Sequence, residues 1–377
     1  MKILVGNNHL AKTGGTENYT YTLAVELKRK GHDVQYFTFE KGEVSALLEQ
    51  AGIPFMSQNQ YDLILANHNT VVEKLWTYGF IIQTCHGTIP TLEQPSPYAD
   101  MYVTISEEVR DYILGLGYES TVIPNGIDCN RFFPKKPVSP TLTAVLSLCQ
   151  SNEANEFIRK CCEKMNIKFI LSNKYTDNVW AVEDMINQSD LVVGLGRSAY
   201  DAMACGRCAL SYDYREYMGE FLGDGLLTPE NIEKSMYCNC SGRSSRLQYD
   251  EQTFCDEMQK YSPELASWSR EFALLHLNIE VAVEKYLEIY RNKDNKPYEY
   301  ALKARLKHLL EELSVKEEAV KAEKQQMHNK LLSMQYQLNE VQATCNAKAK
   351  KHLRAIRVLL WLCIGMIILL VTLTIVR

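Results

Sequence analysis

The stretch Asp190–Asp213, DLVVGLGRSAYDAMACGRCALSYD, decides the fold of this chain. Its apolar run Leu191–Val193 is short, and Gly194 and Gly196 follow it. A short apolar run bounded by turn residues is typical of a strand that is buried on both faces of a parallel sheet. The stretch therefore begins with a predicted buried strand that ends in a glycine turn.

A short helix and a second strand complete this unit. Ser198 is predicted to cap the N-terminus of a helix over Ala199–Ala204, and Gly206 is predicted to end that helix. The apolar residues Cys208–Leu210 then predict the next strand. The order strand, turn, helix and strand predicts an open α/β sheet whose strands are mostly parallel.

The glycine turn is a candidate anion-binding site. In an open α/β sheet such a turn lies at the carboxyl edge, where backbone N–H groups and the positive end of the helix favour a negatively charged ligand. Arg197 adds a permanent positive charge, and its guanidinium can bind a phosphate through two parallel hydrogen bonds. The simpler alternative is that Arg197 forms only a surface salt bridge and that the glycines form only a turn.

The segment Asp201–Leu210, DAMACGRCAL, resembles the E-A-M-A-x-G-x-P-V segment of GT-B glycosyltransferases, particularly those of family 4. In that family the acidic residue beside Ala-Met-Ala holds the ribose of a nucleotide-sugar donor, which is the implied role of Asp201. The chain departs from the family at Val193, where a second acidic residue is usual. The form GLGRS resembles a divergent subgroup and implies that Arg197 approaches the donor phosphates, with Ser198 also on the donor side.

The N-terminal segment shows the same alternation. Lys2–Val5 and Val34–Phe39 are predicted strands, and between them the sequence GGTE at residues 14–17 opens a predicted helix through Lys30. Two adjacent glycines allow a phosphate to approach the backbone closely, and the helix that follows supplies its positive end. The alternative is a tight turn without a ligand.

With GHDV at Gly31–Val34, this segment resembles the G-G-x-E…L-x-x-x-G-H-x-V start of family 4 enzymes. In those enzymes the paired glycines face the donor diphosphate. The resemblance therefore implies that Gly14, Gly15 and Glu17 belong to the donor site.

Two further predicted strands each lead to a histidine. Tyr61–Ala66 leads to His68, and Phe80–Thr84 leads to His86, so both imidazoles are expected near the ligand-binding edge. HGTIP at residues 86–90 resembles the family's H-G-T-x-P segment, whose histidine contacts the donor sugar at the reaction centre. That is the implied role of His86, whereas a structural role is the alternative for either histidine.

A junction between two domains follows. Ile123–Asp128, IPNGID, resembles the family's segment of the same sequence, and Pro134–Pro140 is rich enough in proline to predict a linker. The expected fold class is α/β with two Rossmann-like domains: residues 1–134 on the acceptor side and residues 141–291 on the nucleotide-sugar side. The family usually has an Arg and a Lys after the first strand of the second domain, and here Cys149–Glu153 replaces them.

Composition narrows the partners and cofactors. A net charge of −5 argues against nucleic acid as the main partner. The 12 cysteines are scattered through predicted helices and strands, and Met1–Val5 runs into a strand rather than a signal peptide, so reduced cysteines are expected. Cys205-x-x-Cys208 and Cys238-x-Cys240 have no suitably spaced histidine nearby. We therefore expect no metal and no cofactor, with the nucleotide sugar as co-substrate.

Residues 298–350 contain no proline or glycine, and apolar residues recur there in alternating steps of three and four. This spacing predicts a coiled-coil stalk with one stutter, and a single solvated helix is the alternative. Lys316 and Glu323 are polar interruptions of the seam. The apolar seam residues are Leu302, Leu306, Leu309, Leu313, Val320, Met327, Leu331, Met334, Leu338 and Val341.

Residues 358–376, VLLWLCIGMIILLVTLTIV, form an uncharged run that is long enough to span a bilayer as a transmembrane helix. Basic residues precede this run, and only Arg377 follows it. By the positive-inside rule, the globular domains are expected in the cytoplasm, which predicts a tail-anchored membrane protein. All tails of an oligomer would enter the same membrane face, so a homo-oligomer through the stalk is expected to be parallel.

Together these features predict a membrane-anchored GT-B glycosyltransferase. The resemblance implies hexosyl transfer from a nucleotide-sugar donor with retention of configuration and without a metal. The membrane anchor favours an envelope or lipid-linked glycan as acceptor. The losses at Val193 and Cys149–Glu153 leave a non-catalytic scaffold as an alternative, and a membrane tether with an incidental globular part is a third interpretation.

Overall fold

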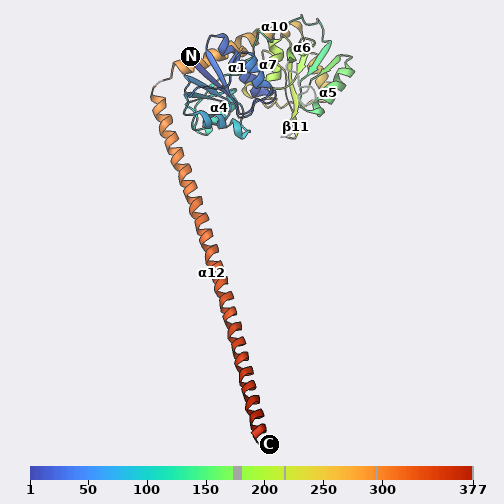
Figure 1. Ribbon diagram of the computed structural model, residues 1–377. Coiled ribbons are helices and arrows are strands. Elements are labelled where there is room, and N and C mark those ends of the chain that lie inside the picture. The colour runs from blue at the N-terminus through green and yellow to red at the C-terminus, as the bar shows by residue number, and fades with distance from the viewer. Residues whose placement is uncertain (173–180, 216–217, 294, 376–377) are drawn as a thin grey trace. The chain divides into compact units, whose positions relative to one another are not determined.

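Two α/β sheets form the globular part of the computed structural model, which describes residues 1–172, 181–215, 218–293 and 295–375 (Figure 1). The chain divides into two units, residues 1–305 and residues 306–377. Both sheets belong to the first unit, and each unit is described by itself below.

The first sheet has six parallel strands in the order β2-β1-β3-β4-β5-β6. Its strands are β1 (Lys2–Gly6), β2 (Asp33–Phe37), β3 (Leu63–Ala66), β4 (Phe80–Cys85), β5 (Met101–Thr104) and β6 (Thr121–Val122). The helices of this half are α1 (Gly15–Arg29), α2 (Glu43–Gln50), α3 (Asn69–Leu75), the 3-10 turn η1 (Thr91–Glu93) and α4 (Glu107–Gly115).

The second sheet has the order β11-β10-β9-β7-β8, and only β11 is antiparallel to its neighbour. Its strands are β7 (Ala144–Ser147), β8 (Lys168–Leu171), β9 (Leu191–Val193), β10 (Cys208–Arg215) and β11 (Glu220–Leu226). The helices are α5 (Asn152–Lys164), α6 (Val182–Ile186), α7 (Arg197–Ala204), α8 (Ile232–Tyr237), α9 (Glu251–Met258), α10 (Pro263–Phe272), the π-helical turn η2 (Ala273–Leu277) and α11 (Ile279–Arg291).

The core of the first half includes a helix from the far end of the second half. Ile279, Val283 and Tyr286 of α11 are buried in the same cluster as Leu23 and Leu27 of α1. The Tyr19 hydroxyl donates to Tyr286 Oη at 2.9 Å, and both side chains are buried. The segment after Ile279 therefore packs into the core of the first half.

The parallel αβ pattern follows the predicted elements closely, but the predicted cap at Ser198 is wrong. Helix α7 begins at Arg197, and its N-cap is Gly196, whose φ of 57° lies in the left-handed region that glycine adopts without strain. Ser198 is instead the second residue of the helix. The last residue of the loop before α7 has a positive φ, so a glycine occupies the N-cap instead of a residue with a capping side chain.

One further expectation about secondary structure differs from the structure. The strand predicted over Cys208–Leu210 continues to Arg215 and pairs with β11, which was not predicted. Helix α10 is followed directly by the π-helical turn η2, which leads into α11.

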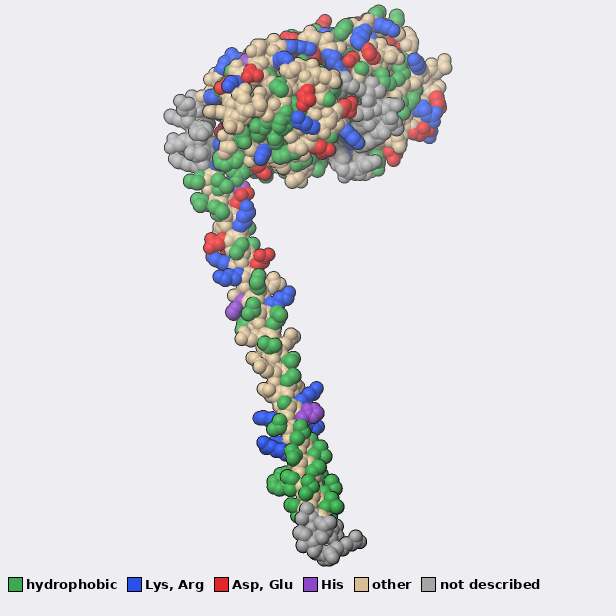
Figure 2. Space-filling view, viewed as in Figure 1, with side chains coloured by type: hydrophobic (Ala, Val, Ile, Leu, Met, Phe, Trp, Pro, Cys, Tyr) green, Lys and Arg blue, Asp and Glu red, His purple; other side chains and the backbone are tan. Residues whose placement is uncertain are grey.

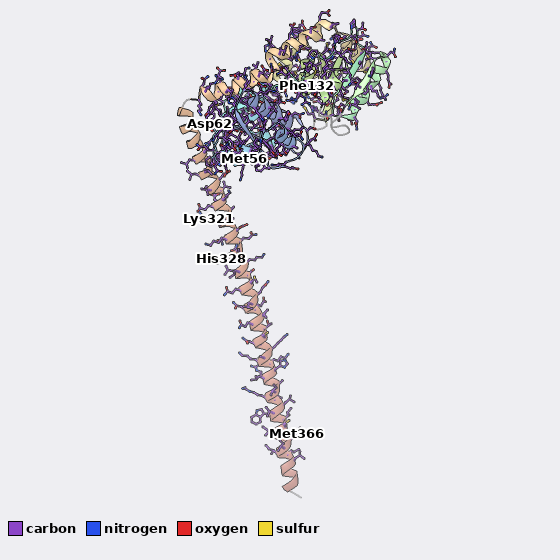
Figure 3. All side chains as sticks on the ribbon, turned by 45° about the horizontal axis from the view of Figure 1, so that its top comes forward. Met56, Asp62, Phe132, Lys321, His328 and Met366 are labelled. Carbon is purple, nitrogen blue, oxygen red and sulfur yellow. The ribbon has the colours of Figure 1, made fainter. Side chains whose placement is uncertain are left out.

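Helix α12 (Asn295–Ile375) carries both the predicted stalk and the predicted span. Among the described residues, its part His308–Leu370 is the one helix long and apolar enough to cross a membrane, with a mean hydropathy of 2.3 in its most apolar window. Lys321, His328 and Met366 project from this helix in Figure 3, and all three are exposed. Figure 2 shows hydrophobic side chains gathered toward its C-terminal part.

A buried ion pair fixes the start of the long helix within the first unit. Arg305 donates to Asp100 Oδ1 at 2.9 Å and also bonds the carbonyl of Tyr98. Both charged side chains are almost fully buried, and Asp100 Oδ2 accepts the Ile81 N–H at 2.7 Å. Removing one partner of such a pair leaves the other as an uncompensated buried charge.

We therefore expect Arg305→Met to lower the free energy of unfolding by about 3 kcal/mol or more. The double variant Asp100→Asn/Arg305→Met should recover part of this loss, because it leaves no unpaired charge. The measurement is urea unfolding of the full chain in detergent. Arg246→Met, which removes a more exposed pair with Glu220, is the matched control and should cost less than about 1 kcal/mol. An equal effect of the two single variants would contradict this account.

Candidate functional site

Polar side chains join the start of α1 to the carboxyl ends of β1 and β3. Asn7 and Asn67 each donate an amide N–H to Thr20 Oγ1 at 2.8 Å, and Thr20 donates to the Thr16 carbonyl at 2.7 Å. Asn7, Asn67 and Thr20 are all buried. One hydroxyl thus fixes the first turns of α1 against the strand ends, at the edge where the sequence predicts the site.

His86 follows β4 at this edge, and its ring lies edge-on to Tyr19 with centroids 5.3 Å apart. Its Nε2 is 3.0 Å from Asn67 Oδ1. Because the Asn67 amide nitrogen donates to Thr20, Oδ1 is the acceptor, so Nε2 carries the proton and Nδ1 keeps its lone pair. Burial and the neighbouring His68 lower the pKa of His86 to about 3, so its imidazole is neutral at pH 7.

His68 lies beside this site but is engaged by the backbone. Its Nδ1 accepts the Asn8 N–H at 3.2 Å, and the residue is the N-cap of α3. Burial and the neighbouring His9 lower its pKa to about 4. The structure brings both histidines to one edge, as predicted, and gives His68 contacts that a purely structural role explains.

Gly14, Gly15 and Glu17 all lie at the N-terminus of α1, although the two glycines have different surroundings. A Cβ at Gly14 would lie 2.2 Å from Glu17 Oε2, so the glycine makes room for this carboxylate. The Glu17 side chain is buried and pairs with His9 Nδ1 at 2.9 Å. A Cβ at Gly15 would have no atom within 4 Å among the described residues, so Gly15 faces open space at the helix end.

Arg197 reaches from the second half to the first. Its Nη2 is 3.5 Å from Thr22 Oγ1 of α1, and its Nε is 3.6 Å from Asp201 Oδ1 of its own helix. The Arg197 side chain is 13% exposed and that of Asp201 is 9% exposed. Within the described parts of the chain, Nε and Nη1 of Arg197 and Oδ1 of Asp201 have no hydrogen-bond partner. The guanidinium is therefore a mostly buried cation between the halves, with its Nε and Nη1 unused as donors.

Burial raises the pKa of Asp201 to about 6, although the neighbouring Arg197 and Arg131 act in the opposite direction. At pH 7 this carboxyl is mostly ionised and can accept hydrogen bonds. Ser198 is the next residue of α7 after Arg197, and a Cβ at Gly194 would lie 2.9 Å from Ser198 Cβ. Arg197, Ser198 and Asp201 therefore share one end of α7.

Residues 235–245, which follow no recognisable sequence pattern, contact the glycine turn before α7. The Gly196 N–H donates to the Cys240 carbonyl at 2.9 Å, and that carbonyl also accepts the Ser211 hydroxyl. Arg243 from the same segment pairs with Glu108 of α4 in the first half, with its Nε 3.2 Å from Oε1. The serine- and cysteine-rich residues 235–245 thus hold the turn and also bind the opposite half.

Glu93 is a site residue that the sequence did not indicate. A Cβ at Gly87 would lie 2.5 Å from Glu93 Oε2, so this carboxyl lies over the backbone directly after His86. Burial and the nearby Glu17 raise the pKa of Glu93 to about 7. The loop is held by Gln83, which donates to the Gln94 carbonyl and accepts the Ser96 N–H. The only sequence signal was an acid a few residues after the HGTIP motif.

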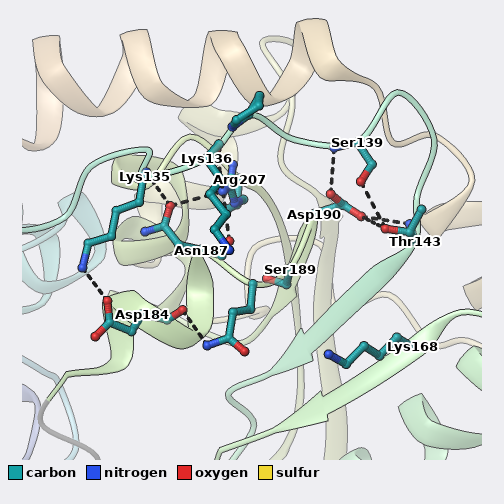
Figure 4. A pocket seen from close by; sticks show the side chains of 12 residues that line it. Lys135, Lys136, Ser139, Thr143, Lys168, Asp184, Asn187, Ser189, Asp190 and Arg207 are labelled. Atoms are coloured by element: carbon teal, nitrogen blue, oxygen red, sulfur yellow. Dashed lines mark hydrogen bonds and ion pairs between the residues drawn. The ribbon is translucent and has the colours of Figure 1, made fainter.

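The cavity drawn in Figure 4 lies elsewhere, at the amino edge of the second sheet. It has a volume of about 730 Å³, and Lys168, the first residue of β8, lines it. Asp190 there accepts hydrogen bonds from Ser139 and Thr143, and Arg207 donates to the carbonyls of Lys136 and Asn187. None of the predicted site residues lines this cavity, and its ionic groups stabilise the sheet connections.

None of the 12 cysteines, all of which the structure describes, forms a disulfide, and ten of them are buried. Among the residues that the structure describes, no group of three or more His, Cys, Asp or Glu side chains is arranged to hold a metal ion. Burial raises the pKa of the Cys205 and Cys208 thiols to about 12, so both are protonated at pH 7.

No protein-family model matches the sequence, and no curated protein matches it. Among solved structures, Anabaena HepE in complex with UDP and glucose aligns with 78% of this chain and 100% of its own, at 16% identity and a TM-score of 0.52. The chain has the GT-B glycosyltransferase fold.

Two further solved structures also align with this GT-B chain. The catalytic domain of Arabidopsis thaliana starch synthase IV, bound to ADP and acarbose, aligns with 77% of this chain and 98% of its own, at 12% identity and a TM-score of 0.48. Acinetobacter baumannii MurG aligns with 78% of this chain and 99% of its own, at 11% identity and a TM-score of 0.43.

The raised pKa of Glu93 has a consequence for stability. A carboxyl whose pKa rises on folding contributes stability below its unfolded pKa, and this contribution is lost as the pH rises through about 7. Glu93→Gln, which mimics the protonated form, should therefore match the wild type at pH 4.5 and exceed its free energy of unfolding at pH 8 by about 1–3 kcal/mol.

Urea unfolding of the full chain in detergent at both pH values measures this difference. Glu288→Gln is the matched control, because Glu288 is an exposed acid on α11, and it should show no gain at pH 8. If the Glu93→Gln variant is no more stable than the wild type at pH 8, then burial of the ionised Glu93 carboxylate does not lower the free energy of unfolding.

Proposed function

We propose that this chain is a retaining, metal-independent glycosyltransferase of the family 4 type that transfers a hexose-like group from a nucleotide sugar. The observation that carries the proposal is the Arg197 guanidinium, which lies between the two halves beside Asp201 with two unused donors. The fold supports it, and HepE, which shares the fold, was solved with UDP and glucose bound.

In this proposal Arg197 stabilises the charge that develops on the departing diphosphate. The contact with Thr22 at 3.5 Å is long for a hydrogen bond, so a phosphate oxygen would replace it at little cost. The N–H groups at the start of α1, beside Gly14 and Gly15, and those at the start of α7, beside Ser198, would complete the anion site. Donors fixed before the reaction lower the barrier without reorganising.

Asp201 and His86 would hold the two sugars of the donor. The Asp201 carboxylate, mostly ionised at pH 7, would accept hydrogen bonds from the ribose hydroxyls. The neutral His86 ring has Nδ1 without a partner among the described residues, so it would accept a hydroxyl of the transferred sugar. Glu17 would act indirectly, by fixing the first turn of α1 through its contact with Gly14.

The long C-terminal helix would place this enzyme at a membrane. We propose that residues 358–376 span the bilayer as a tail anchor and that the globular domains are cytoplasmic, since the basic residues precede the span. An envelope or lipid-linked glycan would then be the acceptor. The stalk, residues 298–350, would pair in parallel with the stalk of a second copy through its apolar seam.

Arg197→Ala tests the proposed chemistry. We expect turnover to fall at least tenfold, since the loss of about 1.4 kcal/mol of transition-state stabilisation has that effect. The measurement is nucleotide release by the full chain in detergent, with a panel of nucleotide sugars as donors and a native membrane extract as acceptor. Arg159→Ala, which removes an exposed arginine of α5, is the matched control and should leave turnover unchanged.

Release that depends on Arg197, His86 and Asp201 would establish an enzyme and identify its donor. Unchanged turnover in Arg197→Ala would remove this side chain from the mechanism. No turnover with any donor, from a folded chain, would favour the scaffold described next.

A non-catalytic scaffold is the second candidate, and one contact favours it. The family's basic pair is absent after β7, and the loop there is occupied by Asp213, which accepts the Gln150 N–H at 3.0 Å and the Ser151 hydroxyl at 2.8 Å. The family's second acidic residue is also absent, since Val193 stands in its place and is buried in β9. Both changes remove groups that would otherwise face the donor.

Cross-linking tests the proposed parallel stalk. Cys345 continues the seam four residues after Val341 and is exposed, so parallel pairing would bring the two copies of this thiol together. In a Cys363→Ser background, mild oxidation should give a disulfide-linked dimer. Moving the thiol to the outer face, with Cys345→Ser and Ala347→Cys, should reduce this product severalfold. Equal cross-linking of both variants, or none, would contradict a parallel seam.

A further inference from the structure

Six basic residues lie on α12 directly before the apolar run. From Val341 to the end of the chain the sequence contains no aspartate or glutamate. All six side chains are exposed, and none forms an ion pair within the described residues. We call this group the basic belt: Lys348, Lys350, Lys351, His352, Arg354 and Arg357.

We propose that the basic belt binds the anionic headgroups of phospholipids at the membrane surface. This inference rests on the proposed membrane anchor, and it adds a ligand class and a binding site to it. The belt ends at Arg357, next to the first residue of the apolar run. At about 1.5 Å per residue, Arg354 and Arg357 would lie within one Debye length, about 8 Å, of the start of the apolar run, and the whole belt would lie within about two Debye lengths.

The geometry of the belt fits lipid better than a protein partner. At about 100° per residue, its members cover about 220° of the helix circumference, which is wider than one stripe. Over about 14 Å of helix, their long side chains can reach the headgroup layer over most of the helix surface. A protein partner would contact one face of the helix, whereas lipids surround it. Figure 2 shows the basic side chains directly above the hydrophobic end of the helix.

The charges farther up the stalk behave differently. Between Leu306 and Glu340 the sequence has six acidic residues and five lysines, so the two signs nearly balance. Lys321 pairs with Glu317 at 2.8 Å within the helix. The upper stalk can neutralise its charges internally, but the belt has no carboxylate to do so. Its counter-charges must come from outside the helix.

The heptad pattern of the seam also favours lipid around the basic belt. The heptad steps that end in Val341 and Cys345 continue to Lys348 and His352, so the belt interrupts the apolar seam. Between two parallel copies the two Lys348 ammonium groups would face each other and repel. Anionic headgroups between the helices would remove this repulsion. The apolar pairing would therefore stop near Cys345, and lipid would replace it.

Trp361 allows a direct test, because it lies in the first turn of the apolar run and is 74% exposed. The full chain would be reconstituted into bilayers of phosphatidylcholine and phosphatidylglycerol, with bromine on the acyl chains of one lipid or the other. Bromine quenches tryptophan fluorescence on contact, so the ratio of the two quenching signals reports which lipid adjoins the helix. A Trp361→Phe variant gives the background from the other three tryptophans.

We expect phosphatidylglycerol to be preferred at least about fivefold, the effect of one basic side chain near an anionic surface. The preference should fall as salt is added. It should disappear in a variant with Gln at five positions: Lys348→Gln, Lys350→Gln, Lys351→Gln, Arg354→Gln and Arg357→Gln. A control variant with Gln at four lysines of the upper stalk should keep the preference for phosphatidylglycerol: Lys316→Gln, Lys321→Gln, Lys324→Gln and Lys330→Gln.

The possible outcomes distinguish failure of the lipid-binding inference from failure of the proposed membrane anchor. Equal quenching by the two brominated lipids would overturn lipid selection by the belt while leaving the anchor intact. No quenching by either lipid would show that Trp361 is not in the bilayer, which would overturn both. If the five-position variant still prefers phosphatidylglycerol, another part of the chain selects the lipid and the basic belt does not.

Discussion

A chain of three buried hydroxyls holds the two halves of the globular unit together. Tyr19 of α1 donates to Tyr286 of α11, and Tyr286 lies 2.7 Å from Thr84 of β4. Because α11 follows the second sheet in sequence, this contact ties the last helix of that half to the core of the first. Arg197 of the second half contacts Thr22, which lies three residues after Tyr19 on α1. Both contacts between the halves therefore fall on the same helix.

Burial gives the site an unusual charge balance. It raises the pKa of Glu93 and Asp201 and lowers the pKa of His86, so each of these shifts favours a neutral side chain. An arginine keeps its charge at any physiological pH. At pH 7 His86 is therefore neutral and Glu93 is about half protonated, whereas Arg197 at the start of α7 is a permanent cation beside the mostly ionised Asp201.

The sequence predicted those parts of the fold and site that depend on local patterns. The short apolar run of β9, the glycines before α1 and the histidine after β4 were all placed correctly at one edge, because strand ends and glycine turns are set by nearby residues. Glu93 and β11 were missed for the opposite reason. The carboxyl matters only because the loop folds it over Gly87, and β11 forms only because β10 is already in place. Neither contact leaves a periodic signal.

One departure from the family 4 pattern, the missing basic pair after β7, coincides with contacts of the Asp213 side chain. Asp213 at the end of the second sheet binds the Gln150 and Ser151 N–H groups at the start of α5, so this helix end already has an internal anion. A diphosphate could not use the same N–H groups, and a basic pair there would be attracted to Asp213 rather than to a ligand. In the proposed function, the diphosphate would therefore bind at the ends of α1 and α7. Arg197 would then carry alone the charge that the resemblance to family 4 assigns to two residues, so the proposed catalysis would depend on this side chain.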